Sequence, residues 1–305
     1  MKPTMRSVLV VVLAGACRGG EQTPPPPAPA LATQVHQLVA ASGGQTVGIY
    51  FRDLNRPDSL LHDADVRLHA ASTMKIPVMI QVFRDAETGR LALDDTVVVK
   101  NEFGSIADGS LYELDRADDS DSSLYERIGQ PATVRELVDL MITVSSNLAT
   151  NILMDLVDPG RVTATMRQLG ADSIHVLRGV EDQKAYEAGL SNTTTARDLG
   201  IIMGTIAEHR AAGEAACRAM EEVLARQRFN DGLPSGLPPG TRVAHKTGWI
   251  TGLHHDAAIV GAAGTPRYVL VVMVRGLERD ASARLMGDVA RLVHQHVTAP
   301  PPPAP

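Results

Sequence analysis

Short apolar stretches bounded by turn residues occur toward both ends of the chain, and they predict β-strands. The first covers residues 47–51 and is followed by turn residues around 55–57. Two more cover residues 255–260 and 268–274. We expect the strands from the two ends to pair into one antiparallel sheet of about five strands.

Apolar residues at helical spacing predict helices between and around these strands. Residues 72–87 are apolar almost throughout, which is typical of a helix buried at the centre of a fold. Residues 133–157 predict helical segments broken around 145–147. The remaining predicted helices cover residues 31–41, 195–209, 214–227 and 281–297. This order predicts an α+β fold with helices flanking the sheet and an inserted all-helical lobe, roughly residues 75–210.

Composition limits the function classes. The chain has 305 residues, of which 44% are hydrophobic and 3% aromatic, so aliphatic residues and Met must fill a large core. The formal net charge is −6, and no run of Lys and Arg resembles a nucleic-acid-binding stripe. We therefore expect no nucleic-acid partner.

The N-terminus predicts export. Residues 1–16 join a basic start to the apolar run 8–14, which is too short to span a bilayer and is typical of a removable signal peptide. Cys17 follows a sequence like a lipoprotein cleavage box, although Leu13 lies one place further from it than usual. Simple signal cleavage is the alternative. We expect an exported protein, either periplasmic or tethered to the membrane through a lipid on Cys17.

Proline-rich segments flank the predicted folded domain, residues 31–297. Residues 17–30 read as an extended tether, and residues 298–305 as a disordered tail. The second cysteine, Cys217, lies in an Ala-rich helical stretch and is expected to be a buried structural thiol. Nothing in the sequence indicates an oligomer, so we expect a monomer.

The first candidate for chemistry is Ser72-Thr73-Met74-Lys75. At the start of a helix, Ser72 and Lys75 would share one face, and the helix N-terminus favours developing negative charge. A desolvated lysine can serve as the base that a serine nucleophile needs. Many solvated helix surfaces carry the same pattern, so alone it is only a hypothesis.

The second candidate is Ser145-Ser146-Asn147, at the predicted helix break. A serine hydroxyl here could relay a proton to a leaving nitrogen. Asn147 could bind a substrate amide or orient Lys75. A polar helix break without chemistry is the alternative.

The third candidate is His245-Lys246-Thr247-Gly248, at the start of the C-terminal strands. Lys246 and Thr247 are suited to binding a carboxylate. Gly248 would let a ligand approach the backbone closely. A surface turn is the alternative.

Together and in this order, the three motifs resemble those of class A β-lactamases and their penicillin-recognising serine hydrolase relatives. The resemblance spans roughly residues 31–297. It includes residues 178–182 and 192–195, which resemble the start and end of the omega loop of that family. It implies a two-lobe β-lactamase/transpeptidase-like fold and an acyl-enzyme reaction on a β-lactam, without a cofactor.

The resemblance implies a catalytic role for each matching residue. Ser72 would attack the lactam carbonyl, and Lys75 would accept its proton directly or through water. Ser145 would protonate the lactam nitrogen. The backbone N–H groups of Ser72 and Trp249 would form the oxyanion hole. Glu181 would activate the water that releases the acyl group.

It also implies a set of substrate-binding residues. Lys246 and Thr247 would hold the substrate carboxylate, and Asn147 would hold an amide. Gly248 and Trp249 would line the pocket, although packing alone is an equal explanation for Trp249.

The chain departs from the family pattern in the omega loop. The usual Glu-x-x-Leu-Asn is not matched after Glu181, where residues 182–185 read Asp-Gln-Lys-Ala. Glu187, with Leu190 and Ser191 after it, is a rival for the base. That no carboxylate does this job is the third possibility.

Two further departures lie nearer the second motif. Ser146 replaces the usual Asp of Ser-Asp-Asn, a residue with a largely structural role. Residues 104–123, between the first two motifs, are longer than usual and rich in acids. We expect a solvated surface excursion near the mouth of the cleft.

Adjacent His254 and His255 raise the question of a metal site. Neighbouring strand residues point to opposite faces of the sheet and chelate poorly, so we expect no metal.

Three functions remain. The favoured one is a serine β-lactamase, which needs a working deacylation base. The second is a D-alanyl-D-alanine carboxypeptidase or a related penicillin-binding peptidase or esterase, which the weak omega-loop match supports. The third is a non-catalytic penicillin-binding sensor module.

Overall fold

A five-stranded antiparallel sheet carries the fold, as the sequence predicted. In the computed structural model, which describes residues 30–299, the strand order is β2-β1-β11-β10-β9. The N-terminal part supplies β1 (Thr46–Asp53) and β2 (Ser59–His62). The C-terminal part supplies β9 (Val243–Ile250), β10 (Leu253–Val260) and β11 (Tyr268–Arg275). β1 pairs with β11 along its whole length, which joins the two ends of the chain at the centre of the sheet.

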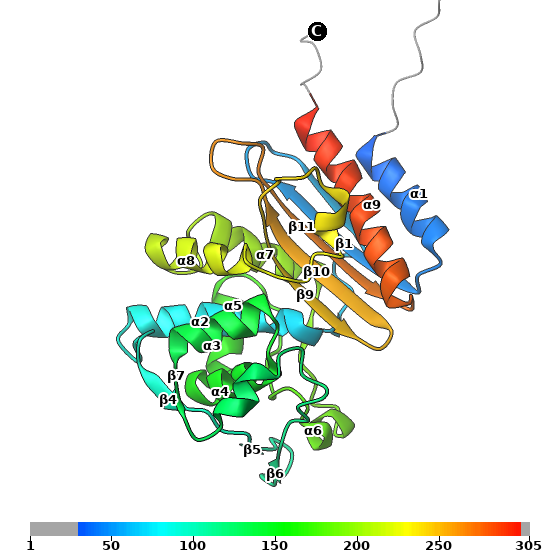
Figure 1. Ribbon diagram of the computed structural model, residues 1–305. Helices are drawn as coiled ribbons and strands as arrows, with labels where there is room; N and C mark the ends of the chain where they lie inside the picture. The colour runs from blue at the N-terminus through cyan, green and yellow to red at the C-terminus, as the bar shows by residue number, and fades with distance from the viewer. Residues whose placement is uncertain (1–29, 300–305) are drawn as a thin grey trace, which may run out of the picture.

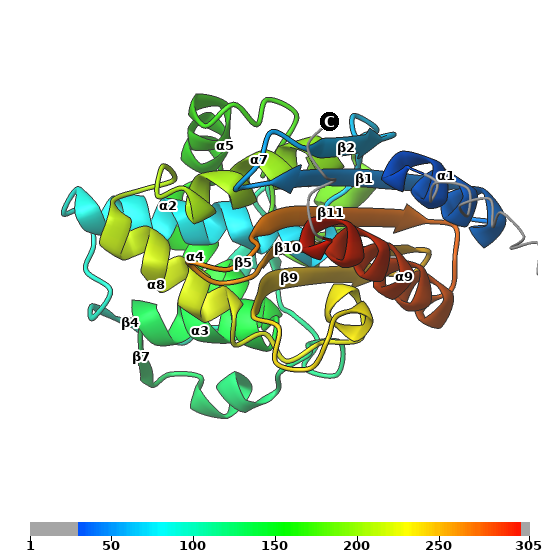
Figure 2. The ribbon, with the colours of Figure 1, turned by 90° about the horizontal axis from the view of Figure 1, so that it is seen from above.

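The sheet is buried on both faces because alternate side chains of its strands enter different cores. In β11, Val269, Val271 and Met273 belong to the core that faces the helical part of the chain. Leu270 and Val272 belong to a second core. This second core lies under α1 (Leu31–Ser42) and α9 (Arg279–Thr298), which cover one face of the sheet (Figures 1 and 2).

The other face packs on a group of helices. They are α2 (Lys75–Glu87), α3 (Val134–Thr143), α4 (Asn147–Val157), α5 (Pro159–Gln168), α6 (Gln183–Glu187), α7 (Ala196–Ala207) and α8 (Glu214–Leu224). Short strands and 3-10 turns connect them: β3 (Leu68–His69), η1 (Ala71–Met74), β4 (Thr96–Val98), β5 (Phe103–Gly104), β6 (Leu111–Tyr112), η2 (Ser123–Arg127), β7 (Pro131–Thr133), β8 (Thr193–Thr194) and η3 (Leu233–Gly236). α7 lies directly against β1, β10 and β11, and α8 contacts β9.

The predicted central helix is α2, whose apolar side chains are almost all buried. It starts later than expected, because η1 forms the turn that contains Ser72. Pro77 has no N–H group to bond the carbonyl of Thr73, so the α-helical pattern begins at Lys75. Ser72 therefore precedes the regular helix.

The predicted break in residues 133–157 is confirmed, since α3 ends at Thr143 and α4 begins at Asn147. α5 was not predicted, because Asp158-Pro159-Gly160 reads as a turn. Asp158 instead caps the helix through Gly160 N, with proline in its first turn.

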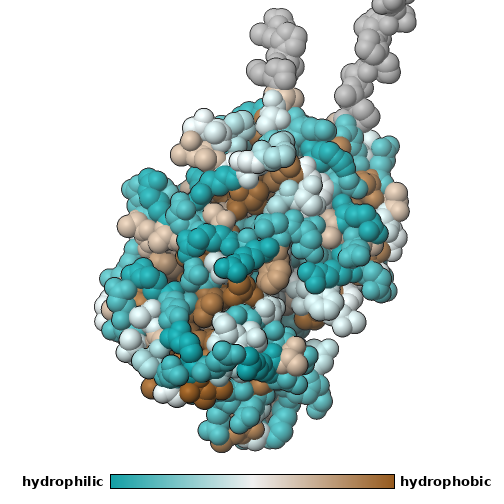
Figure 3. All heavy atoms as spheres, in the orientation of Figure 1, coloured by the Kyte–Doolittle hydropathy of each residue, from teal (hydrophilic) through white to brown (hydrophobic). Residues whose placement is uncertain are grey.

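The ends of the chain lie largely outside the described residues. The predicted signal peptide, the lipid site at Cys17 and nearly all of the tether and tail fall there. Thr298, assigned to the tail, is instead the last residue of α9. Cys217 is fully buried, as predicted. Within residues 30–299, no helix combines the length and apolarity needed to cross a membrane. The face seen in Figure 3 is mostly hydrophilic, with small apolar patches.

The packing of α7 on the sheet depends on Gly200. A Cβ atom there would lie 2.1 Å from Cδ1 of Tyr50 on β1. Gly200→Ala should therefore lower the free energy of unfolding by about 1–3 kcal/mol, despite the better helix propensity of Ala. Urea denaturation measures this. Gly104→Ala is the control, because its Cβ would have no neighbour within 4 Å. An unchanged midpoint for Gly200→Ala would contradict this packing.

Candidate active site

The three motifs meet where β9 passes the start of α2 and the α3–α4 turn. Ser72, Ser145 and Thr247 line one small pocket of about 100 Å³, with Trp249 and His254 on its wall. They come from three different parts of the chain, so it is the fold that brings them together. The structure therefore brings the predicted hydroxyl, amine and carboxylate-binding groups to one place.

Lys75 is fully buried at the floor of this site. Its Nζ donates to the carbonyl of Ser145 at 2.7 Å and to Asn147 Oδ1 at 2.9 Å, and lies 3.2 Å from Ser145 Oγ. Burial lowers the pKa of Lys75 to about 7, although Asp119 and Glu181 oppose the shift. A lysine with such a pKa is partly neutral near pH 7 and can accept a proton.

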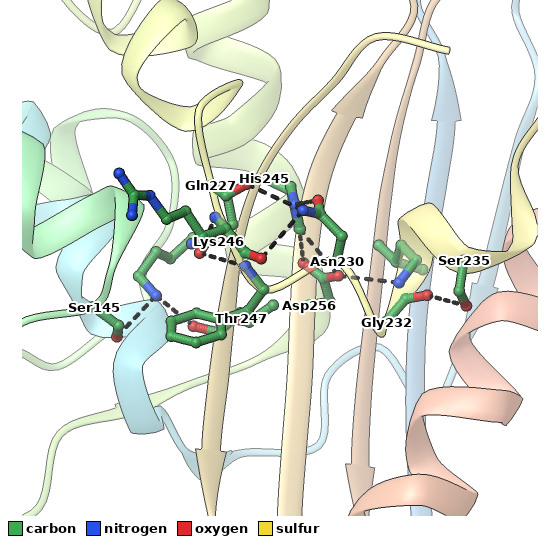
Figure 4. Close-up of polar contacts among 12 residues, drawn as sticks. Ser145, Gln227, Asn230, Gly232, Ser235, His245, Lys246, Thr247 and Asp256 are labelled. Carbon is green, nitrogen blue, oxygen red and sulfur yellow. Dashed lines mark hydrogen bonds and ion pairs between the residues drawn. The ribbon is translucent and has the colours of Figure 1, made fainter. Parts of the chain in front are cut away.

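Lys246 reaches Ser145 from the opposite side. Its Nζ donates to Ser145 Oγ at 3.0 Å and to the carbonyl of Thr247 at 2.8 Å (Figure 4). Burial, and then the charge of Lys75, hold the pKa of Lys246 well below its usual range. The Ser145 hydroxyl oxygen thus accepts from two amines, which leaves its own proton free to be donated.

Backbone strain is concentrated at this site. Six non-glycine residues have positive φ within residues 30–299, and three of them belong to the site. Ala71 (φ 45°) precedes the candidate nucleophile, Ser145 (φ 59°) carries the hydroxyl between the lysines, and Glu181 (φ 63°) is the candidate base. Such conformations cost about 1–3 kcal/mol each and persist where surrounding contacts enforce them.

Gly248 is required by the packing of β9. A Cβ atom there would lie 2.9 Å from Thr73 N and 3.0 Å from Ser72 N. The backbone of η1 therefore approaches Gly248 closely, a contact that the sequence did not predict. This contact presses β9 against the turn that carries the nucleophile.

Glu181 lies beside the amine cluster, whereas its rival does not. Asn147 Nδ2 donates to Glu181 Oε1 at 3.0 Å, and Asp115 N donates to Oε2 at 3.2 Å. Burial raises the pKa of Glu181, and these two hydrogen bonds oppose the rise. Glu187 is exposed at the end of α6 and bonds Gln183. The structure thus separates the two candidates: Glu181 reaches the site, and Glu187 points into solvent.

The segment 178–192, called the omega segment below, is held in place by two residues to which the sequence analysis gave no role. Asn151, one turn after Asn147 on α4, accepts from Val180 N at 2.7 Å and donates to the Val180 carbonyl at 3.0 Å. Asn192 accepts from Leu177 N and donates to the Arg178 carbonyl, which closes the two ends of the segment. An amide inside an apolar stretch of α4 was the only available signal for Asn151.

The acidic segment 104–123 is not simply a solvated excursion. Ser105 is buried and its hydroxyl donates to Asp182 at 2.7 Å, while Ile106 N donates to the same carboxylate. With the bond from Asp115 to Glu181, this segment packs over the omega segment. Most of the segment is exposed and Ser120 lines the pocket, so the predicted surface excursion near the cleft is confirmed, whereas its contacts with the omega segment were not predicted.

The histidines of β9 and β10 serve structural contacts. His245 Nδ1 lies 2.9 Å from Asp256, and its Nε2 lies 3.2 Å from Asn230 (Figure 4). His255 Nε2 bonds the carbonyl of His69 at 3.0 Å, close to η1. His254 is directed to the opposite face of the strand, on the pocket wall. Within residues 30–299, no group of three or more His, Cys, Asp or Glu side chains could hold a metal.

Trp249 is half-exposed at the pocket rim. The guanidinium of Arg279, at the start of α9, lies 5.5 Å from its ring centre and also lines the pocket. Arg279 was not predicted, because it lies outside the three motifs. It adds a cation beside Thr247 at the open side of the site.

Comparison with known proteins identifies the group to which this arrangement is similar. The model of the β-lactamase enzyme family matches residues 30–297. A β-lactamase of Streptomyces albus G is 26% identical over 262 residues, which cover 84% of this chain and 81% of that protein. The β-lactamase Toho-2 of Escherichia coli is 25% identical over 277 residues, which cover 85% and 88%.

Solved structures give the same picture. The β-lactamase of Sphaerobacter thermophilus is 29% identical with a TM-score of 0.75, covering 88% of this chain and 99% of that one. A structure titled PBP-A is 27% identical with a TM-score of 0.74, covering 87% and 95%. The predicted fold class is therefore confirmed.

The hydrogen bonds between α4 and the omega segment can be tested by replacing Asn151. Asn151→Ala removes the acceptor of Val180 N–H and one of the two donors to the Val180 carbonyl, which keeps the Tyr112 hydroxyl, and should lower the free energy of unfolding by about 1–3 kcal/mol. It should also speed proteolytic cleavage within residues 178–192. Asp155→Ala is the control on the same helix, because its ion pair with Lys100 is exposed and is worth less than about 1 kcal/mol. Equal stability of the two variants would contradict this role.

Proposed function

The chain belongs to the β-lactamase enzyme family, and we propose that it hydrolyses β-lactams through an acyl-enzyme on Ser72. The observation that carries this proposal is the buried Lys75, held by Ser145 and Asn147 beside a pocket that Ser72 lines. That arrangement provides a nucleophile, a base and a proton relay within one site.

Acylation begins with loss of the Ser72 proton. Neutral Lys75 accepts it, directly or through water, as Ser72 Oγ attacks the lactam carbonyl. The backbone N–H groups of Ser72 and Trp249 stabilise the negative charge on the carbonyl oxygen. Burial lowers the pKa of the Lys75 amine to about 7, so part of the amine is neutral near pH 7 and available to accept the proton.

Opening of the lactam ring needs a proton on the leaving nitrogen. Ser145 donates it, and its hydroxyl is replenished by the proton that Lys75 has taken from Ser72. The bonds from Lys75 and Lys246 to Ser145 Oγ support this direction of transfer, because both amines donate to the oxygen. The step ends with a neutral lysine and a covalent ester.

Deacylation needs an activated water. Glu181 is the base, held by Asn147 and the backbone of Asp115. Burial raises the pKa of Glu181, which makes the carboxylate a better proton acceptor once ionised. In this chain the Asp115 backbone and Asn147 orient the carboxylate where the Leu-Asn pair of the usual omega loop is missing.

The substrate carboxylate is bound at the open side of the pocket. Thr247 and the guanidinium of Arg279 line the pocket there, and the buried Lys246 amine lies behind them, where it donates to the Thr247 carbonyl. We assign the substrate amide to Asn147, whose side chain also bonds Lys75 and Glu181.

A second candidate is a penicillin-binding peptidase that releases its acyl group slowly. Its support is the likeness to PBP-A, together with the unmatched residues after Glu181. A structure of a PBP-A mutant, titled as an acyl-enzyme complex with penicillin G, is 26% identical to this chain, with a TM-score of 0.72. Release of D-alanine from a peptidoglycan peptide would favour this candidate.

We also propose that the protein is exported and acts as a monomer in the periplasm, or on a lipid anchor at Cys17. The support for export and for the anchor is the sequence of residues 1–17 alone.

Mass spectrometry after mixing with penicillin G tests the proposal. The wild-type protein should turn over penicillin with only a transient adduct on Ser72. Glu181→Gln should form the same adduct and lose it about 10²–10⁴-fold more slowly, because its base is gone. Ser72→Ala should form none.

Glu187→Gln is the matched control and should behave like the wild type, since that carboxylate is exposed. A wild-type adduct that lasts for hours would favour the peptidase. Adduct loss at the wild-type rate in Glu181→Gln would remove Glu181 from the mechanism.

A further inference from the structure

Asp119 lies in the acidic segment 104–123, far in sequence from the motifs, yet it closes the start of α4. Both carboxylate oxygens lie 2.9 Å from Asn147 N, and Oδ2 also lies 2.9 Å from Leu148 N. These are the first two N–H groups of the helix, which have no partner within it. The side chain thus bonds the backbone of a residue that contacts both Lys75 and Glu181.

Two side chains together cap the N-terminus of α4. Ser146 Oγ accepts from Ala149 N at 3.3 Å, and Asp119 takes the two N–H groups before it. Ser146 stands where the family motif has an acid, and it carries no charge. The negative charge at this helix N-terminus comes from another segment of the chain instead.

We propose that Asp119 is a positioning residue of the β-lactamase reaction, which supplies from the inserted segment the carboxylate that the second motif lacks. It holds the backbone after Ser145 so that Ser145 and Asn147 face Lys75. The left-handed backbone of Ser145 needs such support, because it is strained by itself. This inference rests on the proposed function.

The contacts favour a carboxylate over any neutral cap. Besides the two helix N–H groups, the oxygens accept from the Tyr125 hydroxyl at 3.1 Å and from Asp121 N at 3.2 Å. An amide at this position would turn one acceptor into a donor that faces other donors. The side chain is only partly exposed, so its charge acts on the site with limited screening.

The negative charge of Asp119 also affects the pKa values of groups in the site. The charged groups that face Lys75 are Asp119 itself, Glu181 from the omega segment and Lys246 from β9. Asp119 raises the pKa of Lys75 and also that of Glu181. Both groups must lose a proton to act, so removing the charge should move the acidic limb of the rate profile to lower pH.

Asp119→Asn tests the proposal with a chromogenic cephalosporin. The plateau of kcat/KM should fall about tenfold or more, because Ser145 and Asn147 are less well held. The acidic limb should move to lower pH by about half a unit or more. A purely structural role would change stability and leave the limb where it is.

Two further variants sharpen the test. Asp121→Asn removes a matched charge two residues away, whose side chain contacts only Ser123, and should keep the wild-type profile. In the double variant Asp119→Asn/Ser146→Asp, the acid returns at the motif position. That variant should recover part of the plateau.

A wild-type plateau and limb in Asp119→Asn would overturn the proposal, as would a profile equally changed in Asp121→Asn. If Asp119→Asn does not fold, Asp119→Glu decides, since it keeps the charge and displaces it. The proposal then requires a lower plateau with an unmoved limb, and an unchanged plateau overturns it. Absence of turnover in the wild type would instead defeat the proposed function, so the two failures are distinguishable.

Discussion

Burial of the Lys75 amine is the constraint around which the site is built. An ammonium group without water must find acceptors or lose its proton, and the acceptors of this one are the Ser145 carbonyl, Ser145 Oγ and Asn147 Oδ1. Those acceptors come from the α3–α4 turn, so the geometry of that turn decides the chemistry of a residue on α2. The strained backbone of Ser145, the Asp119 cap on α4 and the hydrogen bond from Lys246 to Ser145 Oγ all lie at this turn and help to fix its geometry.

The fold supplies the rigidity that this arrangement needs. The sheet is buried on both faces, and its edge strand β9 is pressed against η1 at Gly248. α2 and α4 pack in the interior of the helical part, so the nucleophile turn and the second motif are both anchored by buried apolar residues. The omega segment and residues 104–123 lie on the outside of the site, and polar contacts from Asn151, Asp182 and Asn192 hold them.

Much of the fold and part of the site could be predicted from the sequence, because they follow from periodic patterns. Continuous apolar runs identify β10, β11 and α2, and the spacing of Ser72 and Lys75 needs only one helical turn. The contacts of Asn151 and Asp119 could not be predicted in this way. They join polar side chains to backbone groups 28 or more residues distant along the chain, and no local pattern marks such a partner. Residues 104–123 are largely the solvated excursion that their acids predict, but nothing in the sequence marks Asp119 among them as a structural acceptor.

The most direct test is an NMR titration of the lysine side chains, because the whole chain has only five lysines. With ¹³C at Cε, each lysine side chain can be followed by its own signal, and an unperturbed lysine has a pKa of about 10.4. The account predicts that the Lys75 signal, assigned by its loss in Lys75→Arg, has its midpoint near pH 7. A Lys75 midpoint near the unperturbed value would mean a permanently charged ammonium at neutral pH, and would contradict its role as proton acceptor.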